Sequence, residues 1–120
     1  MPNSILLQRL LKAAFWAALG FALVMALLPR PPQLPGAPSD KLQHVIAFAV
    51  LAGLAAAAYP RVGLGRIGAM LAAFGALIEL LQLIPALHRD GSVADWIADA
   101  VAIAVVLGIA ALVRALTAGR

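Results

Sequence analysis

Eight polar side chains in this 120-residue chain are candidates for chemistry, because they interrupt apolar runs that need no polar group. They form three groups along the sequence: Asp40, Lys41 and His44; Glu79 and Gln82; and Arg89, Asp95 and Asp99. Within each group two members are three or four residues apart, which places them on one face of a helix. We predict that these faces converge on one polar, ligand-binding pocket.

The residue types in these groups fit three kinds of chemistry. Carboxylates and an imidazole can act as general acids and bases. Lys41 and Arg89 can meet a phosphate or balance a carboxylate. As a further alternative, the oxygen ligands and the imidazole suit a hard divalent cation, with four candidate ligands: His44, Glu79, Asp95 and Asp99.

Each candidate also has a structural interpretation. Asp40 follows a serine and is suited to a helix N-terminus, where the helix dipole favours an acid. Lys41 can extend its amine to the membrane interface, and Asp95 can cap the helix that follows it. Glu79 and Asp99 resist such explanations, because an ionised carboxylate costs about 2.5–3.5 kcal/mol near the centre of a membrane-spanning helix. They need partners or protons.

Other familiar sites are missing from the sequence. The chain has no cysteine, which excludes disulfides, thiolate metal sites and a cysteine nucleophile. It has no GxSxG elbow, no phosphate-binding Walker loop and no HExxH motif. The sequence therefore identifies no catalytic residue, and we predict neither a cofactor nor an assigned metal site.

The composition excludes a water-soluble domain. Hydrophobic residues make up 64% of the chain and charged residues 12%, against about 45–50% and about 25% in ordinary soluble domains. The net charge of +4 does not indicate nucleic-acid binding, because the basic residues are scattered singly between apolar runs. Membrane lipids are the expected surroundings.

Four apolar runs have the length of membrane-spanning helices, about 20 residues each. We predict an all-α fold, a bundle of four transmembrane helices in a single domain, residues 1–120. The predicted spans cover about residues 10–28, 42–59, 67–84 and 93–113. The first run has some features of a signal peptide, but it lacks a clear cleavage site and we interpret it as a span.

Lysine and arginine counts predict that both chain termini face the cytoplasm. With the N-terminus inside, six basic residues lie on the inner side and three on the outer side, as the positive-inside rule requires. The loops 29–39 and 85–91 are then external, and the polar groups form a layer below the outer interface. We expect a pocket open to the outside and roofed by loop 85–91, with Trp16 and Trp96 as bilayer anchors.

The order of these motifs resembles the VanZ-like family of small bacterial membrane proteins. The resemblance covers roughly residues 39–111. Its elements are Asp40-Lys41-x-x-His44-x-x-x-Phe48, then Glu79-x-x-Gln82, then Arg89 followed by Asp95 and Asp99. The family commonly has Asn at the position of Asp99, so this chain carries an additional carboxylate.

The resemblance implies a multi-pass protein of the bacterial cytoplasmic membrane with a role in the cell envelope and an effect on susceptibility to the glycopeptide teicoplanin. Combined with the polar residues, it predicts a pocket for a lipid headgroup or a lipid-linked cell-wall precursor. The alternative is an intramembrane acid–base or metal-assisted hydrolase or transferase acting on a lipid-linked substrate.

Overall fold

The computed structural model describes residues 2–29, 40–87 and 91–118, which form four long helices. Their bounds are Pro2–Leu27 (α1), Asp40–Ala58 (α2), Leu64–Leu81 (α3) and Val93–Ala118 (α4), and a short 3₁₀ turn, η1, spans Pro85–Leu87. None of the described residues lies in a strand. All four long helices have the length and composition to cross a membrane. The predicted all-α bundle is confirmed, and the chain is a multi-pass membrane protein.

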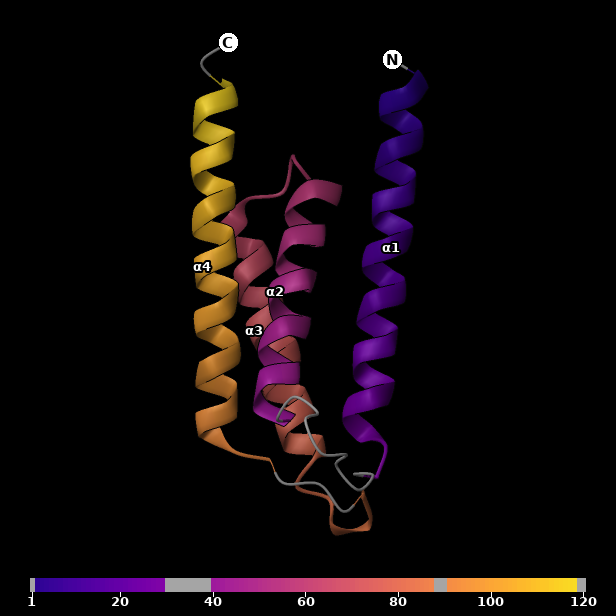
Figure 1. The fold of residues 1–120 in the computed structure, drawn as a ribbon, viewed down its shortest axis with the longest axis vertical. Helices are drawn as coiled ribbons and strands as arrows, with labels where there is room; N and C mark the ends of the chain where they lie inside the picture. The colour runs from indigo at the N-terminus through magenta and orange to yellow at the C-terminus, as the bar shows by residue number, and fades with distance from the viewer. Residues whose placement is uncertain (1, 30–39, 88–90, 119–120) are drawn as a thin grey trace.

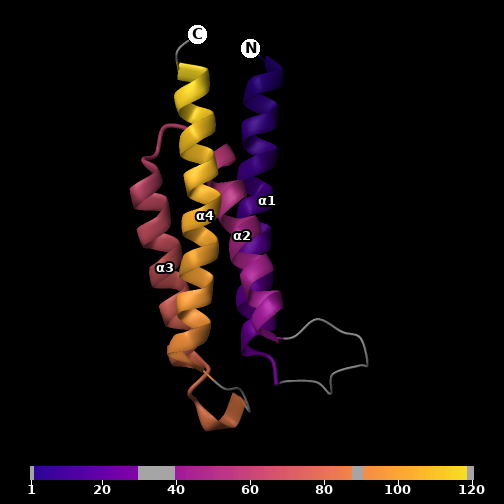
Figure 2. The same cartoon turned by 60° about the vertical axis from the view of Figure 1, so that its left-hand side comes forward.

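The helices pack as a bundle with both termini at one end (Figure 1). Helix α2 contacts each of the other three helices, and α3 also packs along α4 (Figure 2). At about 1.5 Å per residue, α2 and α3 are just long enough for a hydrocarbon layer of about 30 Å. Helices α1 and α4, with 26 residues each, are longer. They therefore extend beyond α2 and α3 at the end that holds the termini (Figure 1).

The surface of the bundle differs from that of a soluble protein, because it is as apolar as the interior. The interior around α2 is apolar, with Phe48, Leu51 and Ala52 almost fully buried. The outer surface is also apolar, and large hydrophobic side chains on α1, α3 and α4 are 61–72% exposed: Phe21, Met70, Leu80, Val93 and Leu112. Exposing this surface to water would be unfavourable, whereas lipid tails can cover it.

The two largest differences from the predicted helix boundaries lie at the end that holds the termini. Helix α1 begins at Pro2 rather than near residue 10, and α4 continues to Ala118 rather than ending near residue 113. A charged residue ends an apolar run but does not end a helix. Both helices therefore continue past the arginines that bounded the predicted spans, Arg9 and Arg114. Proline also suits the first turn of α1, where its missing N–H is not needed.

The two tryptophans occupy different environments. Trp16 is 55% exposed, and its indole N–H donates a hydrogen bond of 2.7 Å to the Tyr59 hydroxyl. Trp96, also expected to anchor the protein in the bilayer, is partly buried between helices instead. Its indole N–H donates to the Ala72 carbonyl at 2.9 Å, and its ring lies against Gly75, where a Cβ atom would come within 3.4 Å of it. Trp96 therefore joins α4 to α3.

We expect Trp96→Phe to lower the free energy of unfolding by about 1–2 kcal/mol, because it removes a partly buried hydrogen bond and some ring volume. Trp16→Phe is the matched control. It also loses an indole hydrogen bond, but an exposed one, and should cost less than about 0.5 kcal/mol. Unfolding by SDS in mixed micelles, followed by circular dichroism, measures both. Equal losses would contradict the assigned role of Trp96.

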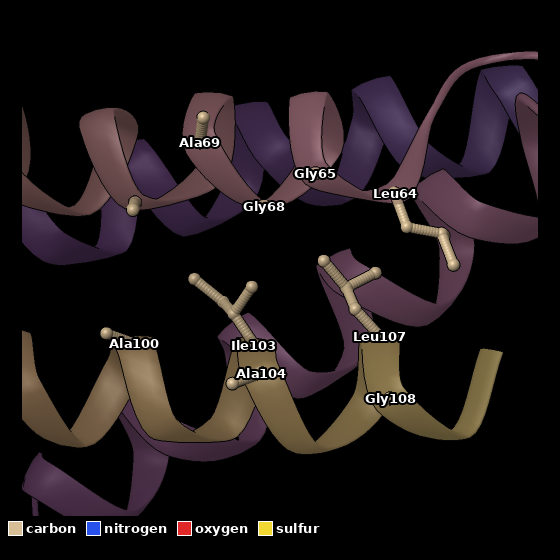
Figure 3. Close-up of a pocket in the computed structure, with 10 residues that line it drawn as sticks. Leu64, Gly65, Gly68, Ala69, Ala100, Ile103, Ala104, Leu107 and Gly108 are labelled. Atoms are coloured by element: carbon tan, nitrogen blue, oxygen red, sulfur yellow. The ribbon is translucent and has the colours of Figure 1, made fainter. Parts of the chain in front are cut away.

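A shallow apolar groove of about 410 Å³ runs between α3 and α4 on the outside of the bundle (Figure 3). Small residues of both helices create it, among them Gly68 and Ala72 of α3 and Ala104 and Gly108 of α4. None of its lining residues is ionisable. The groove is therefore a packing feature of the lipid-facing surface and is distinct from the polar residues described next.

Candidate functional site

Three buried ionisable side chains from three helices come together inside the bundle. They lie toward the end opposite to the termini, where α2 and α4 begin and α3 ends (Figure 1). His44 lies one turn inside α2, Glu79 in the last turn of α3, and Asp99 nearly two turns inside α4. His44 Nδ1 is 3.8 Å from both Glu79 Oε1 and Asp99 Oδ2. One nitrogen or oxygen of each residue lies within 4.8 Å of the other two. We call these three residues the polar centre.

The polar centre is closed to its surroundings within the part of the chain that the structure describes. His44 and Glu79 are 9% and 8% exposed, and Asp99 is 1% exposed. The structure thus differs from the expected open pocket: the residues are together, but they are buried among the helices. Separations of 3.8 Å are too long for hydrogen bonds. The two carboxylates are therefore close to the imidazole without being hydrogen-bonded to its Nδ1.

The carboxylate oxygens of the polar centre are only partly satisfied. Glu79 Oε2 accepts a hydrogen bond of 2.8 Å from the Ser92 backbone N–H. Glu79 Oε1 and both Asp99 oxygens are buried with no hydrogen-bond partner among the described residues. Burying an ionised carboxylate without a partner is expensive. The polar centre is thus chemically suited to gain a proton, a cation or a hydrogen-bond donor.

Residues 91 and 92 hold the polar centre in place from the loop side. Besides binding Glu79 through its backbone, Ser92 caps α4, because its hydroxyl oxygen accepts the Asp95 N–H at 3.0 Å. Gly91 passes so close to the end of α3 that a Cβ atom would lie 2.4 Å from the Glu79 carbonyl oxygen. Only glycine allows this approach, which sets the position of the Ser92 N–H.

Lys41 and Asp95 form an ion pair at the rim of the polar centre. Their charged atoms are 3.9 Å apart, and the Lys41 side chain is 56% exposed against 20% for Asp95. Asp95 is thus paired with Lys41 and is not in the cluster of ligand atoms found among the described residues, although the four-residue spacing had suggested a role shared with Asp99.

Of the other three predicted site residues, Gln82 is the one whose side chain the structure describes. Gln82 is 1% exposed, and its side-chain N–H donates to the Ala26 carbonyl at 2.9 Å. Its amide nitrogen thus fastens the end of α1 to α3. Asp40 is the first residue of α2, but its side chain lies outside the described residues, as does the whole of Arg89. The proline-rich loop is likewise outside them, from residue 30 to 39.

A second polar cluster, which the sequence reasoning missed, lies at the opposite end of the bundle. The Arg114 guanidinium of α4 donates hydrogen bonds to the carbonyls of Val62, Ala56 and Tyr59 at 2.9, 3.1 and 3.2 Å. The last carbonyls of a helix lack intrahelical donors, and Pro60 prevents α2 from continuing. A basic residue predicted on the same side as a proline-terminated helix was the signal available in the sequence.

Comparison with known proteins identifies no relative, since no family model, no curated protein and no solved structure matches the chain. The likeness to the VanZ-like family thus stands on the motifs of this sequence alone. The polar centre is therefore the feature of the molecule that bears on its function.

Proposed function

We propose that the chain is a VanZ-like multi-pass protein of the bacterial cytoplasmic membrane that binds a lipid headgroup or a lipid-linked cell-wall precursor at its polar centre. One observation carries the proposal: the His44, Glu79 and Asp99 side chains are gathered inside one end of a bundle that is otherwise apolar. Intramembrane ionisable residues are costly and are usually retained for function.

The chemistry of the polar centre favours a ligand that donates hydrogen bonds. Carboxylate oxygens without partners can accept bonds from hydroxyl, amide or ammonium groups, which lipid headgroups and precursor sugars carry. The phosphate of the same ligand would meet Lys41, which is exposed at the rim. The Lys41 amine lies 3.9 Å from the Asp95 carboxylate. Because this ion pair is loose, the amine can also contact an anion.

The lysine and arginine bias supports access from the outer leaflet. In the predicted orientation, the polar centre lies below the outer interface, because it occupies the end of the bundle away from the termini (Figure 1). A site at this position would meet precursors after their transfer across the membrane. The effect on teicoplanin susceptibility is proposed from the resemblance to the VanZ-like family, and this position is consistent with it.

A second candidate function is catalytic. The His44 imidazole lies 3.8 Å from carboxylate oxygens of two different helices, an arrangement suited to transferring a proton during hydrolysis or group transfer on a lipid-linked substrate. In this alternative, the polar centre would convert the lipid-linked ligand rather than only bind it.

Native mass spectrometry of protein released from mild detergent tests the binding function. We expect the wild-type protein to retain a lipid or lipid-linked adduct, and Glu79→Ala to lose at least about nine-tenths of it. Arg66→Gln, an exposed cation of α3 near the other end of the bundle, is the control and should keep the adduct. Equal adducts in all three proteins would contradict the proposal.

The same variants separate the candidate functions in cells. In a teicoplanin-susceptible bacterium, expression of the wild-type protein should change susceptibility and expression of Glu79→Ala should not. A catalytic role predicts that Glu79→Gln still retains the ligand but no longer converts it, because the amide cannot act as a base. A binding role predicts no conversion by any of the proteins.

A further inference from the structure

We propose that His44, Glu79 and Asp99 bind a single divalent transition-metal ion of the zinc class. The inference goes beyond the proposed function, since an ion can occupy the polar centre whether or not a lipid or a lipid-linked precursor binds there. It rests on three observations: the donor atoms, their spacing and the unsatisfied oxygens.

The donor set is one imidazole nitrogen and two carboxylate oxygens. Imidazole is a ligand for zinc and other late transition metals, whereas calcium and magnesium prefer oxygen alone. Catalytic zinc sites commonly use three protein ligands of these types and keep one position open for water or substrate. The residue types therefore indicate a zinc-like ion rather than an alkaline-earth ion.

The spacing of the donors is close to that around one ion. Zinc bonds of about 2.1 Å to nitrogen and oxygen place two ligands of a tetrahedral site about 3.4 Å apart. Both Nδ1 to oxygen distances are 3.8 Å, and the three ligand atoms lie within 4.8 Å of one another. These separations are somewhat longer than the tetrahedral value, so an ion would draw the three side chains closer together.

The unsatisfied oxygens are the independent reason to expect a ligand here. Asp99 is 1% exposed, and neither of its carboxylate oxygens has a hydrogen-bond partner among the described residues. Glu79 Oε1 is likewise buried with no hydrogen-bond partner among the described residues, whereas Glu79 Oε2 accepts a hydrogen bond from the Ser92 N–H. A divalent ion would satisfy these oxygens and neutralise two negative charges in a lipid-surrounded site.

The surrounding contacts match those of a supported metal ligand. Metal-bound carboxylates are usually oriented by a second hydrogen bond that leaves one oxygen for the ion. The Ser92 N–H does this for Glu79, at 2.8 Å. The capped start of α4 in turn fixes Ser92, so one oxygen of Glu79 faces the imidazole without depending on the ion.

Metal analysis of the purified protein tests the inference directly. The full chain, purified in detergent without a histidine tag, is equilibrated with Zn²⁺, freed of unbound metal and analysed by mass spectrometry of the elements. We expect about one zinc ion per chain in the wild-type protein. Titration with Co²⁺ should give visible absorption of a site with nitrogen and oxygen ligands. Wild-type protein that takes up neither ion would overturn the inference.

Two variants of identical chemistry locate the ion. Asp99→Asn should weaken zinc binding at least about 100-fold, whereas Asp95→Asn, one turn earlier on α4 and paired with Lys41, should bind as the wild type does. Glu79→Gln provides a second test on a different helix, and circular dichroism shows that each variant is folded. Equal zinc binding by the Asp95 and Asp99 variants would contradict the assigned ligands.

The metal and the lipid proposals fail in different ways. Zinc bound by a protein that carries no lipid adduct would remove the proposed function and leave the metal site. A lipid adduct on a protein that binds neither zinc nor cobalt would contradict the metal site and leave the proposed function standing.

Discussion

Arg114→Ala is expected to lower the free energy of unfolding by about 2–3 kcal/mol. The substitution removes three hydrogen bonds from a charged donor to main-chain carbonyls of α2 and of the loop that follows it. Bonds from charged groups contribute about 1.5–3 kcal/mol each when buried, but the Arg114 guanidinium is only partly buried and solvent reduces its contribution. Unfolding by SDS in mixed micelles measures the loss.

The controls for Arg114 separate charge from geometry. Arg66→Ala removes an exposed cation from α3 and should change stability by less than about 0.5 kcal/mol. Arg114→Lys keeps the charge but cannot reach three carbonyls in a fixed fork, so it should recover less than half of the loss. Full recovery by lysine would show that charge alone matters and would contradict the capping role.

Gly91→Ala is expected to destabilise the protein by about 2–3 kcal/mol and to disturb the polar centre as well. The new methyl group would lie 2.4 Å from the Glu79 carbonyl oxygen and 3.2 Å from Leu83 Cδ2. The carbonyl belongs to the backbone and cannot rotate away, so the loop must shift, at the cost typical of overpacking. That shift would separate the Ser92 N–H from Glu79.

Gly20→Ala is the matched control for Gly91. A Cβ atom at Gly20 meets nothing within 4 Å, and Gly20 lies inside α1. Alanine there should stabilise the helix by about 0.5–1 kcal/mol. The measurement is again SDS unfolding, together with the zinc content of the folded protein. A neutral Gly91→Ala variant would mean that the loop does not hold Glu79 as described.

The helices were predictable because each is an apolar run with few interruptions, and lipid leaves an isolated segment no alternative to the helix. The end of α3 was less so. The predicted span continued to residue 84, but α3 ends at Leu81. Pro85 disfavours helical backbone at the residue before it, and residues 82–84 form tighter turns with bonds such as Leu83 N–H to the Leu80 carbonyl.

The membership of the polar centre was predictable only in part. Spacing along one helix shows which residues share a face, and it paired His44 with Asp40, Glu79 with Gln82, and Asp99 with Asp95. It does not show which neighbour that face meets. Gln82, three residues after Glu79, turns its amide nitrogen to α1 instead, because the end of α1 packs there.

Arg114 illustrates a contact that one-dimensional patterns miss. Its acceptors belong to residues 56, 59 and 62, more than fifty positions earlier in the chain. The sequence places Arg114 on the same side of the membrane as the end of α2, but only the packing of α2 against α4 brings the groups together. Long-range capping of this kind depends on the tertiary structure.

The attachment of α1 has a consequence for how the protein responds to membrane thickness. Trp16 bonds to Tyr59 near one end of α2, and the carbonyl of Ala26 receives the Gln82 amide near the other end of the bundle. These two points lie ten residues apart on α1, which corresponds to about 15 Å along its axis. A helix held at two heights cannot tilt independently of its neighbours. Hydrophobic mismatch would therefore be met by tilting of the whole bundle or by deformation of the bilayer.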